Sequence, residues 1–281
     1  MVEIKELKKR LQWAYSSDRN LWRFCAVFLV LGMLFIFVTP PICTVDESAH
    51  LYRTYQVAQL NLVPERVFSN EAGGDIPKGV TDLVGAAILQ DARNYSITVL
   101  ASELRIRESK QTLKVEFTNV ASYPAINYLP QAFGYKIAEI FTDKILVQFY
   151  AARLSNLLFL TGSFALSLYI LPYARRTFAL LMLLPMVFYA GGSLSADVFV
   201  LAMTMIFTAL LLKLLNKEAI SNSEWIYLGF AAAGLAVSKQ TYYILVLTVV
   251  SLLFRRKQKP DFHEVWRVCV VLIAAAMVVC V

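Results

Sequence analysis

The sequence predicts an all-α polytopic membrane protein whose first extracytoplasmic loop is long and partly folded. Hydrophobic residues make up 58% of the 281 residues, and the mean hydropathy is +0.57. A soluble chain of this length would be more polar, because its surface must carry polar atoms. Several apolar runs also approach the roughly 20 residues that a helix needs to cross a bilayer.

Charge and cysteine content argue against two other classes. A formal net charge of +7 could indicate nucleic-acid binding, but the basic residues are spread through the segments between apolar runs, where they orient a membrane protein. Three of the four cysteines lie inside apolar runs, so we interpret them as small hydrophobic residues. Their spacing fits neither a disulfide framework nor a zinc site.

The chain begins with a basic, partly amphipathic segment at residues 1–20, which we expect in the cytoplasm. The apolar run after it is longer than the hydrophobic region of a signal peptide, and no small-residue cleavage site precedes Pro40. We therefore expect this run to remain as a membrane anchor.

About seven transmembrane helices are expected within a module of residues 21–281. Several of them are short and need a thin bilayer or protein neighbours. No polar flank follows the last one, so the natural chain is expected to continue past Val281. The expected spans are residues 21–42, 147–171, 178–192, 197–215, 225–238, 242–254 and 265–281.

Residues 43–146 are expected to form the first extracytoplasmic loop, with helices near the membrane and a small β element. Apolar residues recur with a helical period in residues 46–60. Alternating apolar and polar residues in residues 96–120 predict a short β-hairpin or meander. Residues 131–142 predict a helix that is too short and too charged to span, and that lies on the membrane surface.

The positions of basic residues predict the orientation. If the spans alternate, residues 1–20, Arg175 with Arg176, Lys213 with Lys217, and the basic run at residues 255–259 all lie on one side. The positive-inside rule makes that side cytoplasmic. The long loop and the turns at residues 193–197 and 238–242 then lie outside the cytoplasm.

The first candidate site opens the long loop. Asp46 and Glu47 begin a predicted helix as the chain leaves the membrane, and helical spacing places His50 on the same face. An acidic residue here could cap the helix and complement its dipole. It could also act as a general base whose pKa is raised by burial and by a neighbouring carboxylate. The same three residues are only a weak signal for a metal site.

Other candidates lie at the remaining outer turns and at the start of the second span. Asp197 stands between two apolar spans, where a carboxylate is costly unless it is paired, solvated or functional. The alternative is a helix cap formed by Ser195 or Asp197. Lys239 lies on the outer side, either snorkelling to headgroups or binding a lipid phosphate. Arg153, near the outer surface, could bind phosphate with two N–H groups.

Taken in order, these motifs resemble a family of bacterial polytopic membrane proteins of formerly unknown function. That family is similar in plan to the GT-C superfamily of glycosyltransferases. The resemblance extends over about residues 37–253, and the order and spacing of short motifs carry it. The motifs are Pro40-Pro41, Asp46-Glu47 with His50, Tyr52 and Arg53, Tyr123-Pro124 with Asn127-Tyr128, Arg153 with Asn156, Leu184-Pro185-Met186, Ser193 to Asp197, and Lys239 to Tyr242.

The resemblance implies a function and a set of site residues. GT-C enzymes share a seven-span module and transfer a sugar from a polyprenyl-phosphate-linked donor to an acceptor outside the cytoplasm. Carried over, Asp46 or Glu47 is the catalytic base, and Asp197 with His50 forms a second site near the acceptor. The implied contacts to the donor phosphate are Lys239, Arg153, Arg53 and Tyr242.

The resemblance also implies the setting of the reaction. The expected location is the bacterial plasma membrane, and the expected acceptor is a cell-envelope glycan or a lipid-linked molecule. A divalent metal, Mg²⁺ or Mn²⁺, is possible, with Asp46, Glu47 and Asp197 as its ligands. The transfer is expected to invert the anomeric centre, with cations stabilising the departing phosphate.

The alternative is a non-enzymatic membrane protein, such as a flippase or a scaffold in polysaccharide assembly. A transporter is expected to carry ionisable groups near the middle of the bilayer and to show internal symmetry. The predicted spans are nearly free of charge at that depth and show no repeat, which favours the enzyme over a transporter. A scaffold remains open, and a receptor that uses the outer loop is a third possibility.

Overall fold

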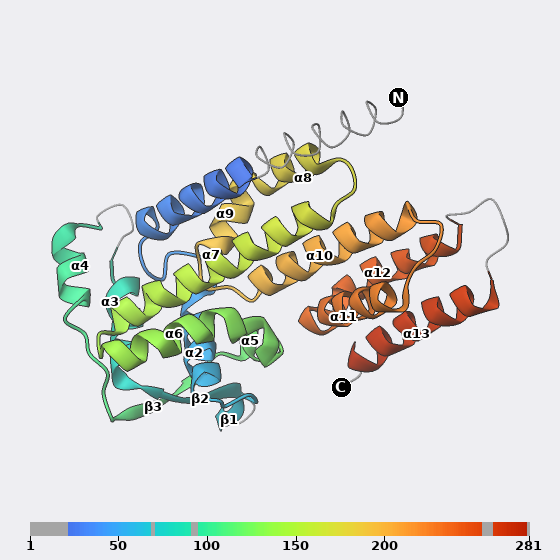
Figure 1. Cartoon of the computed structure of the whole chain (residues 1–281). Helices are drawn as coiled ribbons and strands as arrows, with labels where there is room; N and C mark the ends of the chain where they lie inside the picture. Colours follow the sequence, from blue (N-terminus) through green and yellow to red (C-terminus); the bar gives the residue numbers. More distant parts are fainter. Residues whose placement is uncertain (1–21, 69–70, 91–94, 255–260, 280–281) are drawn as a thin grey trace.

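The computed structural model describes residues 22–68, 71–90, 95–254 and 261–279. Long helices lie side by side along one direction, and a lobe of shorter helices with a small sheet covers one end of them (Figure 1). The predicted cytoplasmic segment at residues 1–20 lies outside the described residues, as do residues 280–281 at the end of the last predicted span.

Two helices in the described part of the chain are long and apolar enough to cross a membrane. They are α7, Ile145–Ile170, and α10, Asp197–Leu215, and both coincide with predicted spans. The helix Trp22–Val38 and the segment Gln240–Phe254 are apolar but shorter. The structure thus supports a mostly helical protein with two candidate spans, and the seven-span count stays a prediction.

Two predicted spans are not continuous helices. The span expected at residues 178–192 consists of α8, Arg175–Met182, and α9, Pro185–Gly191. Pro185 begins α9, because a proline fits the first turn of a helix but cannot donate the hydrogen bond that a helix interior needs. The span expected at residues 242–254 is built from short turns: η3 Gln240–Tyr242, α12 Tyr243–Val246 and η4 Leu247–Phe254.

The remaining long helices complete the bundle. The helix α11, Asn222–Ser238, begins with a capping box in which the Ser221 and Glu224 side chains bond to each other's backbone N–H groups. The last described helix is α13, Phe262–Val279. The helices α10, α11 and α13 share one buried apolar cluster, while Trp22–Val38, α7, α8 and α10 share another.

The lobe is formed by the predicted extracytoplasmic loop. Its helix at residues 46–60 is confirmed as α2, and its surface helix at residues 131–142 is confirmed as a helix, α6. The lobe packs on the first half of α7 through a third apolar cluster. Its elements are α2 Glu47–Ala58, β1 Glu65–Phe68, β2 Glu71–Pro77, α3 Lys78–Ile88, α4 Ile97–Glu103, β3 Thr112–Glu116, α5 Thr118–Ala121, η2 Ala125–Tyr128 and α6 Leu129–Phe141.

The β element is only partly as predicted. The strands form one antiparallel sheet in the order β1-β2-β3, so β3 confirms a strand within residues 96–120. Residues 97–103 are the helix α4 instead, because the Ser96 hydroxyl accepts a hydrogen bond from the Val99 N–H and caps it. The strand that pairs with β3 is β2, and β1 pairs with β2. Both come from residues 65–77, which the alternation pattern did not reveal.

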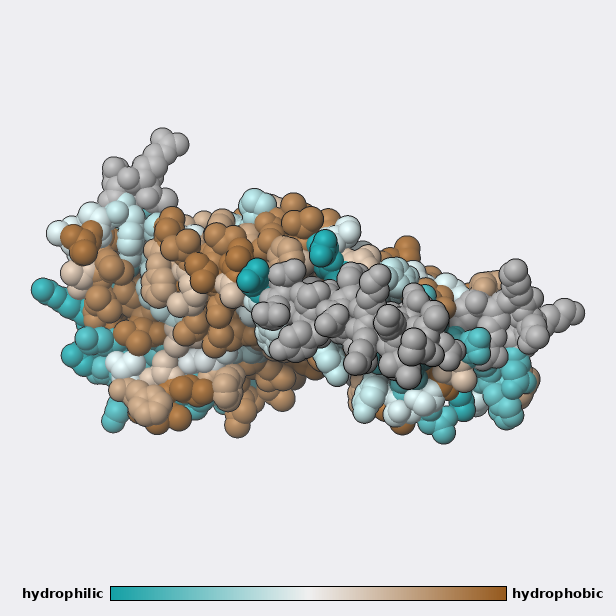
Figure 2. Space-filling view, turned by 45° about the horizontal axis from the view of Figure 1, so that its top comes forward, coloured by the Kyte–Doolittle hydropathy of each residue, from teal (hydrophilic) through white to brown (hydrophobic). Residues whose placement is uncertain are grey.

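Hydrophobic side chains cover much of the helical part of the surface in Figure 2, and hydrophilic ones gather toward the two ends. Exposed apolar residues also form a stripe along α6, at Leu129, Phe133, Ile137 and Ile140. Residues spaced by three or four lie on one face of a helix. This exposed apolar face is the kind expected of a helix that contacts lipid.

Candidate functional site

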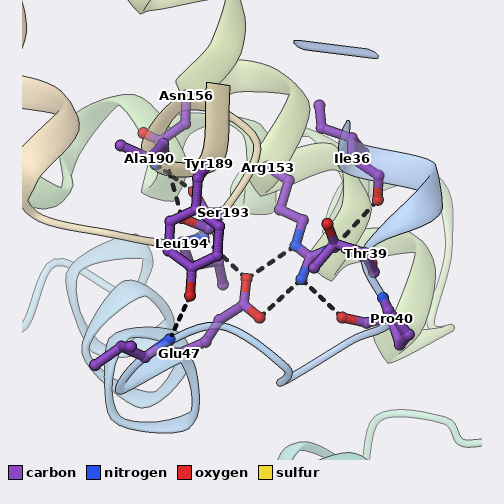
Figure 3. A network of polar contacts seen from close by, with 11 residues as sticks. Ile36, Thr39, Pro40, Glu47, Arg153, Asn156, Tyr189, Ala190, Ser193 and Leu194 are labelled. Atoms are coloured by element: carbon purple, nitrogen blue, oxygen red, sulfur yellow. Dashed lines mark hydrogen bonds and ion pairs between the residues drawn. The ribbon is translucent and has the colours of Figure 1, made fainter. Parts of the chain in front are cut away.

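The centre of the candidate site is a buried ion pair between Glu47 at the start of α2 and Arg153 in α7 (Figure 3). The Arg153 Nε donates to Glu47 Oε1 at 2.9 Å, and Nη2 donates to Oε2 at 2.7 Å. Both side chains are 0% exposed. The two parallel hydrogen bonds are the strongest geometry that a guanidinium and a carboxylate form.

The other N–H groups of Arg153 bond to backbone carbonyls at the end of the helix Trp22–Val38. Its Nη1 donates to the carbonyls of Ile36 and Thr39, at 3.1 and 2.8 Å, and Nη2 donates to the Pro40 carbonyl at 3.1 Å. The last carbonyl groups of a helix have no N–H donors within the helix, and the Arg153 N–H groups take the place of those donors. Its five N–H donors are all used, which leaves none for the predicted phosphate contact in this conformation.

Glu47 also joins the ion pair to the turn before α10. Its Oε1 accepts a third hydrogen bond, from the Leu194 N–H at 3.0 Å. Behind this turn, the buried Asn156 amide donates to the Ser193 carbonyl and to Gln131 Oε1. One polar network therefore ties together the first described helix, α2, α6, α7 and the turn before α10. Figure 3 shows this network apart from the contact with α6.

Breaking such a pair is costly, although having it is not strongly stabilising. Two charges lose their hydration when they are buried, and their attraction roughly offsets that loss. Removing one partner leaves the other as a buried charge and costs about 3–5 kcal/mol. We therefore assign Glu47 and Arg153 the role of holding the site together.

Asp46 lies next to Glu47 but has a different environment. Its backbone is left-handed, with φ 55°, and its side chain makes no capping hydrogen bond to α2. Aspartate tolerates this conformation better than most residues. The helix-cap alternative is thus wrong for the Asp46 side chain, which is exposed at the surface of the lobe.

His50 is buried beside Asp46, one turn into α2. Its Nδ1 lies 3.0 Å from the Tyr128 hydroxyl, and its ring stacks on Tyr123 with a centroid distance of 6.4 Å. Burial lowers the pKa of His50, against the opposing effects of the Asp197, Asp46 and Glu47 carboxylates. The imidazole is therefore neutral at physiological pH.

Asp197 and Lys239 meet although they are far apart in the sequence. Lys239 Nζ lies 3.4 Å from Asp197 Oδ1 and 5.4 Å from the centre of the Tyr123 ring. Partial burial lowers the pKa of Lys239, but Asp197 and Tyr123 raise it more, so the net shift is upward and the amine is charged. The Asp197 carboxylate is 56% exposed.

The alternative function predicted at this turn is a helix cap formed by Ser195 or Asp197. The Ser195 hydroxyl accepts a hydrogen bond from the Asp197 N–H at 3.1 Å. The N-cap residue itself is Ala196, which has no side-chain cap. The prediction of Ser195 or Asp197 as the N-cap is therefore wrong, although Ser195 bonds to the first N–H of α10, and the Asp197 carboxylate is left for Lys239.

The two other predicted phosphate contacts lie apart from each other. Arg53 is buried, and it donates to the Gln56 side chain and to the carbonyls of Asn61 and Leu62, which follow α2. It is thus engaged in the lobe. Tyr242 lies at the end of η3, where it is partly exposed and close enough to Lys239 to raise the pKa of the amine.

The described side chains do not fit a metal ion. In the described ranges, no group of three or more His, Cys, Asp or Glu side chains is close enough to hold one. Glu47, one of the three predicted ligands, has both oxygens occupied by Arg153 and Leu194. We therefore assign no chemistry at this site to a metal.

Sequence reasoning missed the aromatic residues of the site. Tyr123 stacks on the His50 ring, and the Tyr128 hydroxyl lies 3.0 Å from His50 Nδ1. The neighbouring Asn127 is buried, and its amide donates to the Ser238 carbonyl at 2.6 Å. This bond joins the lobe to the turn that carries Lys239. The signal was the motif Tyr123-Pro124 with Asn127-Tyr128, which is quoted for the resemblance but was given no role at the site.

Comparison with known proteins gives the class of the chain and no activity. The model of the family of predicted membrane proteins called DUF2142 matches residues 29–281. The chain belongs to this family, whose function is unknown, and the match does not link it to the GT-C glycosyltransferases. Neither the curated proteins nor the solved structures gave a match.

Proposed function

We propose that this chain is a membrane glycosyltransferase of the GT-C type. It transfers a sugar from a polyprenyl-phosphate-linked donor to a cell-envelope glycan or lipid-linked acceptor outside the cytoplasm. The observation that carries the proposal is the grouping of Asp46, Asp197 and Lys239, from three distant segments, around His50. Exposed carboxylates beside a cation and aromatic rings suit a substrate that combines a phosphate with a sugar.

Asp46 is the base in this proposal. Of the two adjacent acids it is the exposed one, whereas Glu47 is buried with both oxygens bonded. The acceptor oxygen attacks the anomeric carbon of the donor while its proton passes to Asp46. The bond from that carbon to the phosphate oxygen breaks, and polyprenyl phosphate leaves with the electron pair. Attack opposite the leaving group inverts the anomeric centre.

Lys239 stabilises the departing phosphate, where negative charge grows in the transition state. Its ammonium is held by Asp197 and Tyr123 before substrate arrives. In this proposal Asp197 and His50 bind the acceptor hydroxyl groups. Arg153 and Glu47 position these groups and do not touch the substrate.

The test compares amide variants of three acids. Asp46→Asn removes the base and keeps its shape, so glycan transfer should fall by about 100- to 10,000-fold with normal protein levels. Glu47→Gln should instead lower the amount of folded protein, because it weakens the buried pair. The matched control is Asp82→Asn at an exposed position of α3.

The measurement is mass spectrometry of envelope glycans from cells that carry each variant, with the protein in the membrane quantified in parallel. Full glycan modification by Asp46→Asn would contradict the proposal and favour a scaffold. The predicted location, with residues 1–20 in the cytoplasm and the site outside, is part of the proposal.

A further inference from the structure

A groove between α11 and α13 lies apart from the candidate site. It has a volume of about 480 Å³ and is lined by both helices. The two helices run in the same direction, because the segment of residues 240–254 returns between them (Figure 1). Both therefore begin at the same end of the bundle, which the sequence predicts to face the cytoplasm.

The two helices line the groove with the same spacing. Each contributes a tryptophan near its start, Trp225 or Trp266, and residues one, four, five and eight positions later. Eight residues of helix extend ~12 Å, compared with about 15 Å for one leaflet's share of the hydrocarbon core. The groove is thus long enough for most of one acyl chain within a single leaflet.

Its shape narrows the choice of ligand. Three of the lining residues have small side chains: Gly229, Ala233 and Ala274. A Cβ added to Gly229 would have no neighbour within 4 Å, so the groove is open at this point. A slim, flexible apolar ligand fits such a slot between two helices.

The end of the groove near the helix starts is polar and aromatic. Among the described residues that line the groove, Arg267 is the only charged one. Its Nη2 donates to Asn222 Oδ1 at 2.8 Å, which holds the guanidinium at this end. Trp266 beside it is 59% exposed. Indole rings and arginine at one depth mark the headgroup level of a membrane.

We propose that this groove binds one acyl chain of an anionic phospholipid, with the lipid phosphate at Arg267. Basic pockets between membrane helices on the cytoplasmic side attract anionic headgroups. Another helix could also pack against these small residues. It would then bury the Arg267 guanidinium, and the residues that line the groove supply no carboxylate to pair with it. The proposal does not depend on the glycosyltransferase activity.

The experiment uses the whole chain in lipid nanodiscs that contain phosphatidylglycerol with a photoactivatable group on its acyl chain. Mass spectrometry then locates the labelled peptides. In the wild type, labelling should concentrate on α11 and α13. Gly229→Leu places a side chain in the groove at a position where an added Cβ meets nothing within 4 Å, and it should lower this labelling at least fivefold.

The matched control is Gly162→Leu in α7, where an added Cβ also meets nothing within 4 Å. It should label like the wild type. If Gly229→Leu fails to fold, Ala274→Leu fills the groove from the other helix. Undiminished labelling in a folded groove-filling variant would overturn the proposal.

Arg267→Gln tests the headgroup. It should remove most of the preference for phosphatidylglycerol over phosphatidylcholine while keeping acyl labelling on both helices. An unchanged preference would overturn the assignment of the phosphate to Arg267. Cross-links between copies of the chain across the groove, with no lipid labelling, would overturn the whole proposal and make this face a protein interface.

Discussion

Two adjacent carboxylates at the start of α2 have opposite environments. Glu47 points into the protein, where Arg153 and the Leu194 N–H occupy both of its oxygens. Asp46 has a left-handed backbone and an exposed side chain. The turn before it is unusual too, because Ile42 also has a positive φ, of 59°, which is rare for a β-branched residue. The left-handed backbone at Asp46 thus accompanies the change from an exposed Asp46 to a buried Glu47.

His50 should make stability depend on pH. Burial lowers its pKa below the ordinary value of 6.5, so between the two values the unfolded chain binds more protons than the folded one. The free energy of unfolding therefore rises with pH in this window. The contribution of His50 is complete above pH 6.5 and is lost as the pH falls through the folded-state pKa.

The measurement is thermal unfolding of the detergent-solubilised protein between about pH 5 and pH 7.5. His50→Gln should flatten the dependence below pH 6.5, whereas His263→Gln should not, because that side chain is exposed. These are the two histidines of the chain. An equal slope in the wild type and His50→Gln would contradict this account.

At the scale of elements, close packing of α6 on α7 fixes the lobe to the bundle. Gly134 in α6 faces the Ala151 carbonyl and the Ser155 side chain of α7. The Ser155 hydroxyl also donates to the Pro130 carbonyl at 2.6 Å. Because α6 follows the residues that carry Tyr123 and Tyr128, this packing also sets the position of the aromatic residues at the site.

Gly134→Ala should destabilise the protein. The added Cβ would clash with the Ala151 carbonyl oxygen, so the two helices must separate. We expect a loss of about 1–3 kcal/mol, which exceeds the gain of up to about 1 kcal/mol from replacing glycine in a helix. Chemical denaturation in mixed micelles measures the net change in the free energy of unfolding.

Gly162→Ala provides the control in α7, because its Cβ would meet nothing within 4 Å. It should be neutral or slightly stabilising. If Gly134→Ala were as stable as Gly162→Ala, the contact between α6 and α7 would not hold the lobe in place.

At the scale of the whole molecule, motifs that are distant in the sequence gather at one end of α7. Glu47 and Arg153 are 106 positions apart, and Asn127 and Ser238 are 111 apart. The turns before α10 and after α11 meet through Asp197 and Lys239. Of the motifs quoted for the resemblance, Leu184-Pro185-Met186 takes no part in these contacts and instead marks the break between α8 and α9.

The predicted orientation can be tested with single cysteines in a chain whose own four cysteines are replaced. Lys110→Cys lies in the lobe and Ala219→Cys lies between α10 and α11, and both positions are exposed. A membrane-impermeant maleimide should label Lys110→Cys in intact cells and Ala219→Cys only after permeabilisation. The opposite pattern, or labelling of both in intact cells, would contradict the orientation.

The sequence by itself determined the class of this protein and the helices with the strongest patterns. Hydropathy predicted a helical membrane protein, and α7, α10, α2 and α6 lie where apolar runs or periods placed them. Such patterns are local, so a single segment is enough to reveal them. The sequence also predicted that Asp46, Asp197 and Lys239 share one face, and the structure brings them together around His50. That this face lies outside the cytoplasm stays a prediction.

Only the tertiary structure decided what each of these residues does. Whether a carboxylate is buried and paired, like Glu47, or exposed, like Asp46, depends on partners contributed by other segments. The same holds for Arg153, whose pattern suggested a phosphate contact and whose donors are used by Glu47 and by helix-end carbonyls. The sheet partners of β3 and the tyrosines beside His50 were missed for this reason, because contacts between distant segments leave no local period in the sequence.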